Sequence, residues 1–529
     1  MNTRTEKEAN AYDLVPYESD PHPHLHPDSL ATIAKLFGIE APAANSCRVL
    51  ELGCGCADNL VATAYTLPAA KFVGVDLSPR QIEKGQLLAS ELGLKNIELF
   101  ATDIRQIDHD LGEFDYIIAD GVYSWVSSEL QDKILQICSK NLKNNGVVYI
   151  SYNTYPGWHF SGMIREMMLY HCAQLADPSA RLAQAKALLK FLSESVPAEL
   201  DAYSLMLKSE LQRISQLRDC YLLHEYLEDC NEPIYFHNFV DRAQAHGLQY
   251  LGEAEFRAMI ATNFGEAVES TLRRISTDIV HTEQYMDFIR NRRFRQTLLC
   301  KKELLINRKL SHESVASFLF SSPLKAENPQ LDLRSAQAES FILPNGDKIT
   351  ATHPFNKAAF LSLSELWPQS VCFDDLLNKT LARLTAAGLK DSQSYAAQRQ
   401  TLGENLLNAY AAGTVIFRSE EAPFIARVSE RPQTSALSRL QARTQDFVTN
   451  QWHDKIVVDI FARKLIILLD GQHDHKQILA ELMKSLSQNE LVIKKDGERI
   501  TDLPNTQQIL ETLVQECFQM LAKAALLIA

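Results

Sequence analysis

A nine-residue segment with two closely spaced glycines constrains the fold of this chain more than any other feature. The segment, Glu51–Asn59, contains Gly53 and Gly55 and follows a short apolar run that is typical of a buried strand. It leads into Leu60–Ala64, which predicts a helix. Glycines let a chain turn sharply and let a ligand approach, and the helix start presents unpaired N–H groups. The segment therefore predicts a strand, a turn and a helix around a nucleotide-like ligand.

The residues around the glycines indicate which nucleotide this turn can hold. A dinucleotide fingerprint needs a third glycine three residues after the second, but this chain has Asp58 there, and its carboxylate would repel a pyrophosphate. The sequence also lacks the G-x-x-x-x-G-K-[ST] phosphate loop. Glu51, just before the turn, suits a ligand whose nearby end is cationic. S-adenosylmethionine, with its ammonium and sulfonium, fits this pattern, whereas NAD and FAD do not.

Three further predicted strands also end in acidic residues. The strand at 71–75 ends in Asp76, about twenty residues after the turn, where a carboxylate accepts from both ribose hydroxyls. The strand at 97–101 leads to Asp103, which is placed to accept from the adenine amine, and the strand at 114–119 leads to Asp120. The spacing is that of repeated βα units, so the sequence predicts an α/β sheet.

This ordered pattern resembles the class I S-adenosylmethionine-dependent methyltransferases, whose glycine motif and acidic positions it matches one by one. The resemblance implies a Rossmann-like sheet with S-adenosylmethionine as cofactor. We assign to the cofactor site Glu51, Gly53, Gly55, Asn59, Asp76, Leu77, Asp103, Ile104 and Asp120, together with Tyr17 from the upstream segment. That family usually has a third glycine where this chain has Ala57, and we expect crowding there without loss of binding.

Residues 1–46 are interpreted as an N-terminal lid segment followed by a helix. The proline spacing in 15–27 predicts irregular structure that is placed to cover the cofactor. His22, His24 and His26 alternate within this segment. Alternate histidines in a proline loop are more often polar loop residues than metal ligands, so we predict no metal site.

The acceptor pocket is expected beyond the carboxyl ends of the fourth and fifth strands, because open α/β sheets bind ligands there. The candidate catalytic residues, which follow these two strands, are Tyr123, Trp125, Asn153, Tyr155 and Trp158. The alternative for each aromatic side chain is packing beneath the next helix.

The sequence after the fifth strand predicts a helical insertion, 160–219, and then a region, 220–304, in which a late hairpin completes the sheet. Stretches at 221–227, 235–239 and 247–254 resemble the methyltransferase regulatory domain. Residues 1–304 as a whole are similar to the protein lysine methyltransferases of rickettsiae, which modify an outer-membrane surface protein. The resemblance implies that 47–304 is one domain and that the partner is a lysine-bearing protein. Outer-membrane and surface proteins are among the candidates for this partner.

The remaining chain predicts a mostly α region. Residues 305–330 mix polar residues and prolines and are interpreted as a linker. Two winged-helix-like units, 331–435 and 436–529, explain the elements that follow, including a strand at Leu465–Leu469. His473 and His475 flank Asp474, for which capping the next helix is a simpler role than metal binding.

Charge and composition exclude several other classes. The 529-residue chain has a net charge of −13, which argues against general binding of nucleic acid or membrane surfaces. Its apolar runs are too short to span a bilayer and its first ten residues are polar, so we expect a cytoplasmic protein. Ten scattered cysteines predict reduced thiols.

The chemistry of a lysine acceptor sets a requirement on the pocket. Only about one lysine in 10³ is neutral at pH 7, and an aromatic, partly dry pocket beside the sulfonium would lower that pKa. The sequence shows no strong general base. We predict an S-adenosylmethionine-dependent N-methyltransferase acting on protein lysine. A small-molecule methyltransferase and a non-catalytic cofactor-binding regulator remain alternatives, and the sequence leaves a homo-oligomer open.

Overall fold

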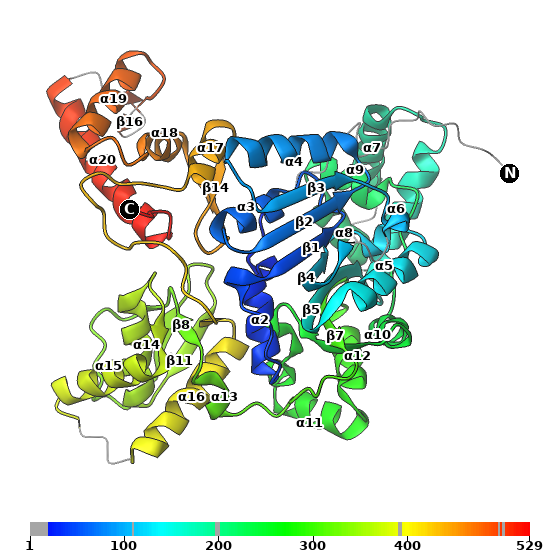
Figure 1. Cartoon of the computed structure of the whole chain (residues 1–529), viewed down its shortest axis with the longest axis horizontal. Helices are drawn as coiled ribbons and strands as arrows, with labels where there is room; N and C mark the ends of the chain where they lie inside the picture. Colours follow the sequence, from blue (N-terminus) through cyan, green and yellow to red (C-terminus); the bar gives the residue numbers. More distant parts are fainter. Residues whose placement is uncertain are drawn as a thin grey trace.

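The computed structural model describes residues 20–107, 111–195, 201–389, 394–492, 494–495, 498–499 and 503–529. A seven-stranded sheet in the order β3-β2-β1-β4-β5-β7-β6 forms its centre (Figure 1). The strands are β1 (Arg48–Leu52), β2 (Lys71–Asp76), β3 (Ile97–Ala101), β4 (Phe114–Ala119), β5 (Leu142–Asn153), β6 (Leu248–Glu253) and β7 (Phe294–Lys301). The first five are parallel, and β7 is antiparallel to both β5 and β6. The predicted Rossmann-like fold class is therefore confirmed.

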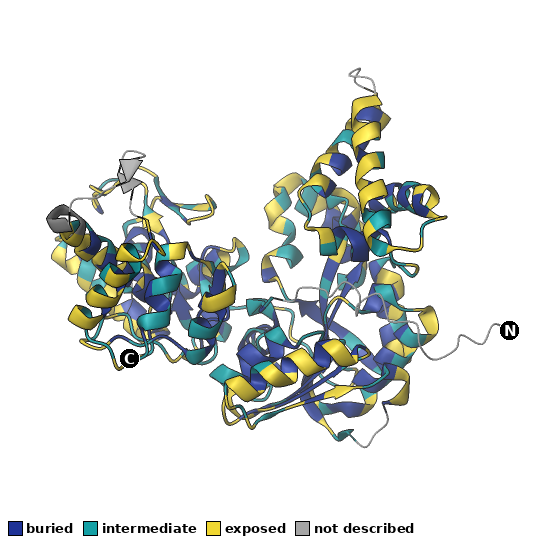
Figure 2. Cartoon of the chain, turned by 90° about the horizontal axis from the view of Figure 1, so that it is seen from above, coloured by how far each residue is buried: buried dark blue, intermediate teal, exposed yellow. Residues whose placement is uncertain are grey.

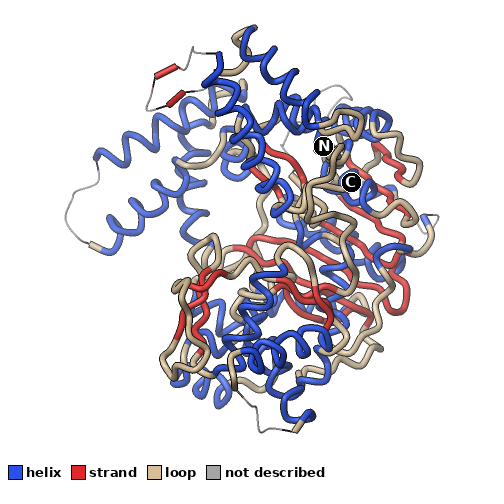
Figure 3. Tube along the Cα trace, turned by 90° about the vertical axis from the view of Figure 1, so that its left-hand side faces the viewer, coloured by secondary structure: helices blue, strands red, loops and turns tan. Residues whose placement is uncertain are grey.

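Successive residues of β1 pack on opposite faces of the sheet. Val49 belongs to the core formed with α2 (Pro27–Leu36), α3 (Asp58–Thr66) and α4 (Pro79–Glu91). Leu50 and Leu52 belong to a second core that includes residues of α5 (Ser128–Asn141) and α10 (Phe236–Ala245). The strands lie side by side with helices around them (Figure 3). Because both faces are covered, the ligand site lies at the carboxyl ends of the strands.

Three helices after β5 fall in the predicted insertion 160–219: α6 (Trp158–Cys172), α7 (Pro178–Ser195) and α8 (Ala202–Ser215). The next helix, α9 (Asp219–Tyr226), begins the predicted region 220–304 and packs with them. They have a hydrophobic core of their own, in which Ile164, Met168, Leu207 and Leu223 are buried. The chain then forms α10, β6, α11 (Glu266–Ile275), α12 (Ile279–Arg290) and β7. The α9 helix returns to the sheet, and this return places its side chains near the strand ends.

The segment 305–330 was expected to be a linker, and this expectation is wrong. It contains α13 (His312–Val315), β8 (Leu319–Ser321) and β9 (Lys325–Ala326), and β8 is the central strand of the sheet β12-β8-β13. Phe318 and Phe320, in and next to β8, are buried. The strand is too short to give a clear apolar pattern among the surrounding polar residues and prolines. The rest of this region comprises β10 (Glu339–Ile342), β11 (Lys348–Ala351), α14 (Pro354–Leu366), β12 (Val371–Cys372), α15 (Phe373–Ala386), α16 (Tyr395–Ala411) and β13 (Ile416–Arg418).

The C-terminal region is also mostly helical. It comprises α17 (Ala436–Thr444), β14 (Phe447–Thr449), β15 (Lys455–Val457), α18 (Ile460–Leu468), α19 (His475–Ser487), β16 (Lys494–Lys495), β17 (Glu498–Arg499) and α20 (Leu503–Lys523). The strand predicted at Leu465–Leu469 is wrong, because most of that run belongs to α18, whose N-terminus is capped by Asp459. A short apolar run does not distinguish a strand from a buried helix. Asp474 caps α19 through a capping box, as predicted.

Buried residues concentrate along the sheet and inside the lobe that holds the C-terminus (Figure 2). That C-terminal lobe has its own core, which includes Leu465, Ile478 and Phe518. Among the described residues, no helix has both the length and the apolar character needed to cross a bilayer.

Candidate functional site

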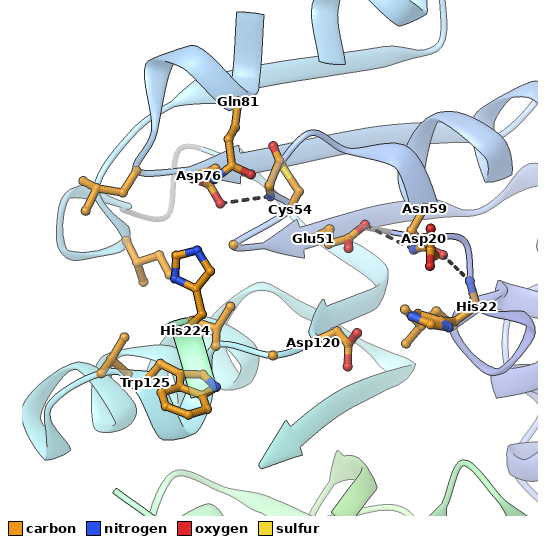
Figure 4. Close-up of a pocket in the computed structure, with 18 of the residues that line it drawn as sticks. Asp20, His22, Glu51, Cys54, Asn59, Asp76, Gln81, Asp120, Trp125 and His224 are labelled. Carbon is orange, nitrogen blue, oxygen red and sulfur yellow. Dashed lines mark hydrogen bonds between the residues drawn. The ribbon is translucent and has the colours of Figure 1, made fainter. Parts of the chain in front are cut away.

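A cavity of about 340 Å³ lies where β1, β2 and β4 end. Nine residues assigned to the cofactor from the sequence line it: Glu51, Gly53, Gly55, Asn59, Asp76, Leu77, Asp103, Ile104 and Asp120. Figure 4 shows four of these side chains, Glu51, Asn59, Asp76 and Asp120, around the cavity. The size is that of a small-molecule site. Tyr17 lies outside the described residues.

The glycine turn brings the backbone close to the cavity. Gly53 has φ +72°, and a Cβ at this residue would lie 2.2 Å from Cγ2 of Val122. The N–H of Gly55 donates to Oδ2 of Asp76 at 2.9 Å, so the carboxylate holds the turn in place. Ala57 is buried in the left-handed conformation at φ 59°, which is the strain that a glycine there would avoid. The turn therefore depends on glycine at Gly53 for both space and conformation.

Glu51 is the most deeply buried carboxylate of the cavity. It is 5% exposed, and its Oε2 accepts from Nδ2 of Asn59 at 3.3 Å. Burial raises the pKa of Glu51 to about 8, although the hydrogen bond from Asn59 acts in the opposite direction. The neighbouring Asp120 raises that pKa further. A cation in the cavity would favour the ionised form of Glu51, so this environment is suited to a positively charged ligand.

This pKa makes cofactor binding depend on pH. Below pH 8 most Glu51 is protonated, and a cationic ligand must displace that proton to bind the carboxylate. We expect the affinity for S-adenosylmethionine to fall between pH 7.5 and pH 6, by up to about tenfold per pH unit. Isothermal titration calorimetry across this range measures the slope, and Glu51→Gln should flatten it. An affinity of the unaltered protein that is constant with pH contradicts the expectation.

The other strand-end carboxylates also have protein partners. Asp76 accepts from the N–H groups of Gly55 and Ser78, and Oδ1 of Asp120 accepts from the Tyr149 hydroxyl at 3.0 Å. Both oxygens of Asp103 accept from Arg105, whose hydrogen bonds lower the pKa of Asp103. The ribose role of Asp76 and the adenine role of Asp103 stay predictions, and the latter requires Asp103 to share its oxygens with Arg105.

Of the five predicted catalytic residues, Trp125 alone lines the cavity within the part of the chain that the structure describes. The prediction for Tyr123 is wrong, because it is fully buried with its ring edge against Phe239, 5.2 Å between centroids. Tyr123 and Trp125 lie in one short 3-10 helix, in which residues two apart point to different sides.

The remaining three candidates also lie outside the cavity. Asn153 is buried at the end of β5, where its N–H donates to Oγ of Ser124. Tyr155 stacks on His159 at 4.1 Å. Trp158 is buried and packs edge to face on Trp125, with 6.4 Å between the ring centroids. It therefore supports Trp125 in the cavity wall without lining the cavity itself. None of these three residues lines this cavity, and their roles at the methyl acceptor stay predictions.

Sequence reasoning missed two groups of cavity residues. Asp20, His22 and Leu25 come from the N-terminal segment, and Tyr221, His224 and Glu225 come from α9. The 221–227 stretch was noted only as a family signature, so its local pattern did not mark it as part of the site. Only the folded chain, in which α9 returns to the strand ends, shows that these residues line the cavity.

Glu225 has a property that none of the predicted catalytic residues has. Burial raises its pKa to about 7, while Arg213 and His224 act to lower it. The carboxylate has no hydrogen bond or ion pair to any residue that the structure describes, which leaves it open to a ligand in the cavity. A group with a pKa near 7 can take up and release a proton at neutral pH.

The alternating histidines of the N-terminal segment have different neighbours. His26 Nδ1 accepts from Asp28 N–H at 3.2 Å and caps α2, and burial lowers the pKa of His26 to about 3. His24 stacks near Tyr149, and burial lowers its pKa to about 4. Among the described residues, no group of histidines, cysteines and carboxylates is arranged to hold a metal ion.

These residues fit S-adenosylmethionine. The cradle at Gly53 has no room for a Cβ, and the cavity is lined by Glu51, Asp76 and Asp120 with no lysine or arginine among its lining residues in the described part of the chain. An anionic pyrophosphate would meet this acidic lining unfavourably, whereas a ligand with an ammonium and a sulfonium is complementary to it. The geometry therefore agrees with the cofactor that the sequence predicts.

Three parts of the chain match known protein families. A family described as a methyltransferase domain matches residues 43–213, a predicted methyltransferase regulatory domain matches 218–301, and a PKMT C-terminal winged helix domain matches 430–526. An uncharacterized protein of Rickettsia prowazekii is 36% identical over 533 residues, covering 99% of this chain and 95% of that protein.

Solved structures give the same result. PKMT2 from Rickettsia typhi is 33% identical and superimposes with a TM-score of 0.88, covering 97% of this chain and 100% of that one. The structure of PKMT2 in complex with AdoHcy matches with the same values. The likeness thus extends over almost the whole chain, including the regions before and after the sheet in the sequence.

Proposed function

This chain belongs to the family of PKMT2 from Rickettsia typhi and is an S-adenosylmethionine-dependent methyltransferase, and from that premise we propose that it methylates lysine side chains of a protein. The observation that carries the proposal is the likeness to PKMT2 over 97% of the chain. It extends beyond the sheet that unrelated methyltransferases share, through the insertion and the C-terminal winged helix domain. We propose a lysine-bearing protein as partner, with outer-membrane and surface proteins as the first candidates.

The charge of the cavity supports a cationic acceptor. Asp20 and Glu225 line it in addition to the carboxylates assigned to the cofactor. A lysine ammonium is attracted to such a site, whereas an anionic small molecule is repelled. Trp125 supplies an aromatic wall, held in place by its edge-to-face contact with Trp158.

The residues of the chain have distinct parts in the reaction. S-adenosylmethionine supplies the electrophilic methyl group when bound. Glu225 accepts a proton from the lysine ammonium: the N–H bond breaks, its electron pair stays on nitrogen as the nucleophile, and the carboxylate becomes a carboxylic acid. Trp125 excludes water and favours the neutral amine, because a dry aromatic wall disfavours the charged form.

Replacing Glu225 tests this assignment. We expect Glu225→Gln to lower kcat about 10²-fold at pH 7, which is the usual range for loss of a general base. The deficit should shrink by pH 9.5, because more of the lysine is then neutral without help. Cofactor affinity should stay near that of the unaltered protein.

Asp219→Asn is the matched control for Glu225→Gln. Asp219 lies at the start of the same helix, but it is exposed and pairs with Lys186 outside the cavity. We expect its pH–rate profile to match that of the unaltered enzyme. A Glu225→Gln variant with full activity at pH 7 would remove Glu225 from the mechanism.

Transfer of radiolabelled methyl groups tests the function itself. The enzyme is incubated with labelled S-adenosylmethionine and either a bacterial lysate, including its outer-membrane fraction, or the small-molecule fraction. Label that survives acid hydrolysis as methyl-lysine supports the proposal and marks the substrate band. Label confined to small molecules contradicts it, and so does the absence of label when calorimetry shows cofactor binding.

A further inference from the structure

A turn of the C-terminal winged helix domain reaches the cofactor cavity. This turn, residues 450–455, runs from the end of β14 to Lys455, the first residue of β15, and Figure 1 shows β14 and α17 next to α3. Its His453 is 1% exposed, and Nε2 lies 2.9 Å from Oδ1 of Asn59. Nδ2 of Asn59 in turn donates to Oε2 of Glu51. A chain of side chains thus connects the C-terminal domain to the most buried carboxylate of the site.

The hydrogen-bond pattern fixes the direction of each contact. Oδ1 of Asn59 also accepts from the backbone N–H of His22 at 3.4 Å, so it is an acceptor, and Nε2 of His453 must carry the hydrogen. Burial and the nearby histidines lower the pKa of His453 well below its usual range, so the ring is neutral. His453 therefore holds the Asn59 amide with its oxygen towards the turn and its nitrogen towards Glu51.

The backbone of the turn is strained at this residue. His453 has φ +69°, in the left-handed region that non-glycine residues rarely adopt. The side-chain oxygen of Asn450 accepts from the N–H groups of Trp452 and Asp454, and His453 N–H donates to the Asn450 carbonyl. These bonds enforce a conformation that glycine would adopt at lower cost. The imidazole is thus better explained by its contact with Asn59 than by the needs of the turn.

A second contact from the same turn reaches another residue that lines the cavity. Nζ of Lys455 lies 2.6 Å from Oδ2 of Asp20, which lines the cavity. Arg218, just before α9, lies 3.7 Å from the same oxygen. Figure 4 shows Asp20 and His22 beside Asn59 and Glu51. Asp20 therefore links the N-terminal segment to both the C-terminal domain and the helical insertion.

We propose that the turn 450–455 is a positioning element of the cofactor site, through which the C-terminal winged helix domain controls cofactor affinity. His453 orients Asn59 and, through it, Glu51, while Lys455 holds the N-terminal segment over the cavity. Displacement of the domain breaks both contacts together, so whatever moves the domain changes binding at the site by the same coupling. The proposal rests on the cofactor and is independent of the identity of the methyl acceptor.

Calorimetry of the full-length protein with S-adenosylhomocysteine tests the coupling without any acceptor. We expect His453→Ala to weaken binding about tenfold, the usual effect of one well-ordered hydrogen bond. His453→Gln, whose amide nitrogen replaces Nε2, should recover most of the loss. Lys455→Ala and Asp20→Asn should each weaken binding about threefold, and the double variant should show less than the product of the two effects.

Lys464→Ala is the control for Lys455→Ala. Lys464 forms an ion pair of the same 2.6 Å length with Glu490 and has similar exposure, but it lies within the C-terminal domain, away from the cavity. Its affinity should equal that of the unaltered protein. Because Lys455 and Asp20 are partly exposed, their variants keep the test decisive if His453→Ala does not fold. Affinities within twofold of the unaltered protein for Lys455→Ala and Asp20→Asn, or equal losses for Lys464→Ala, overturn the proposal.

Discussion

Gly53→Ala is expected to abolish cofactor binding at micromolar concentrations, with a loss of at least about a hundredfold in affinity. The added Cβ would lie 2.2 Å from Cγ2 of Val122, which itself lines the cavity, so Val122 or the turn must move. Alanine at φ +72° adds conformational strain of about 1–3 kcal/mol. Movement of Val122 or of the turn changes the surface that contacts the cofactor. A loss of about 1.4 kcal/mol in binding free energy already lowers the affinity tenfold.

Gly93→Ala is the control that separates the effect of backbone strain from the effect of a changed cofactor site. Gly93 has φ +68°, almost the same as Gly53, but a Cβ there would have nothing within 4 Å. We expect this variant to lose a similar amount of stability to strain, read from thermal unfolding without ligand, and to keep its affinity for S-adenosylhomocysteine. A Gly53→Ala variant that binds within threefold of the unaltered protein would show that the cradle is not needed for binding.

Arg295→Met is expected to lower the free energy of unfolding by about 3–5 kcal/mol, which is the usual cost of breaking a buried ion-pair network. The Arg295 side chain is fully buried at the sheet, where its guanidinium pairs with Glu253, Glu283 and Asp287. Methionine has a similar shape but no charge, so three buried carboxyl groups would lose their shared cation. Urea unfolding followed by circular dichroism measures the loss.

The cost of this substitution should grow with pH. Burial already raises the pKa of Glu283 to about 7 in the intact protein, although Arg295 opposes this. Without Arg295 the folded-state pKa of Glu283 rises further above its ordinary value of about 4.5. The folded variant then binds more protons than the unfolded chain, so stability falls as pH rises from about 5 to 8. We therefore expect a larger deficit at pH 8 than at pH 5.

Arg273→Met is the matched control, since Arg273 forms an exposed ion pair with Glu269 one helical turn away. Its effect should stay below about 0.5 kcal/mol at both pH values. A deficit for Arg295→Met that is equally small would mean that the buried network stabilises the regulatory region no more than a surface pair does.

The sequence determined the parts of the site that depend on local pattern. A strand, a glycine turn and an acidic residue at each strand end are contiguous in the chain, and parallel strands must bring their carboxyl ends to one edge. This is why Glu51, Asp76 and Asp120 were identified before the structure and now line one cavity. The same local logic predicted the capping role of Asp474.

Local pattern was not sufficient where packing decides between alternatives. The apolar run at Leu465–Leu469 suits a strand or a helix, and its burial against neighbouring helices selects α18. Tyr123 and Trp125 are two residues apart and similar in type, yet the orientation of one helical turn sends Tyr123 into the core and Trp125 to the cavity. Residue type alone does not reveal that orientation.

Only the tertiary structure brought distant segments to the site. Glu225 lines the cavity because α9 folds back onto the strand ends, and its raised pKa comes from burial, which is a property of the folded chain. His453 contacts Asn59 across 394 residues, and Lys455 contacts Asp20 across 435. Sequence periodicity carries information over one element, whereas these contacts depend on how whole domains pack. The sequence therefore predicted the cofactor, and only the fold showed which distant segments contact its site.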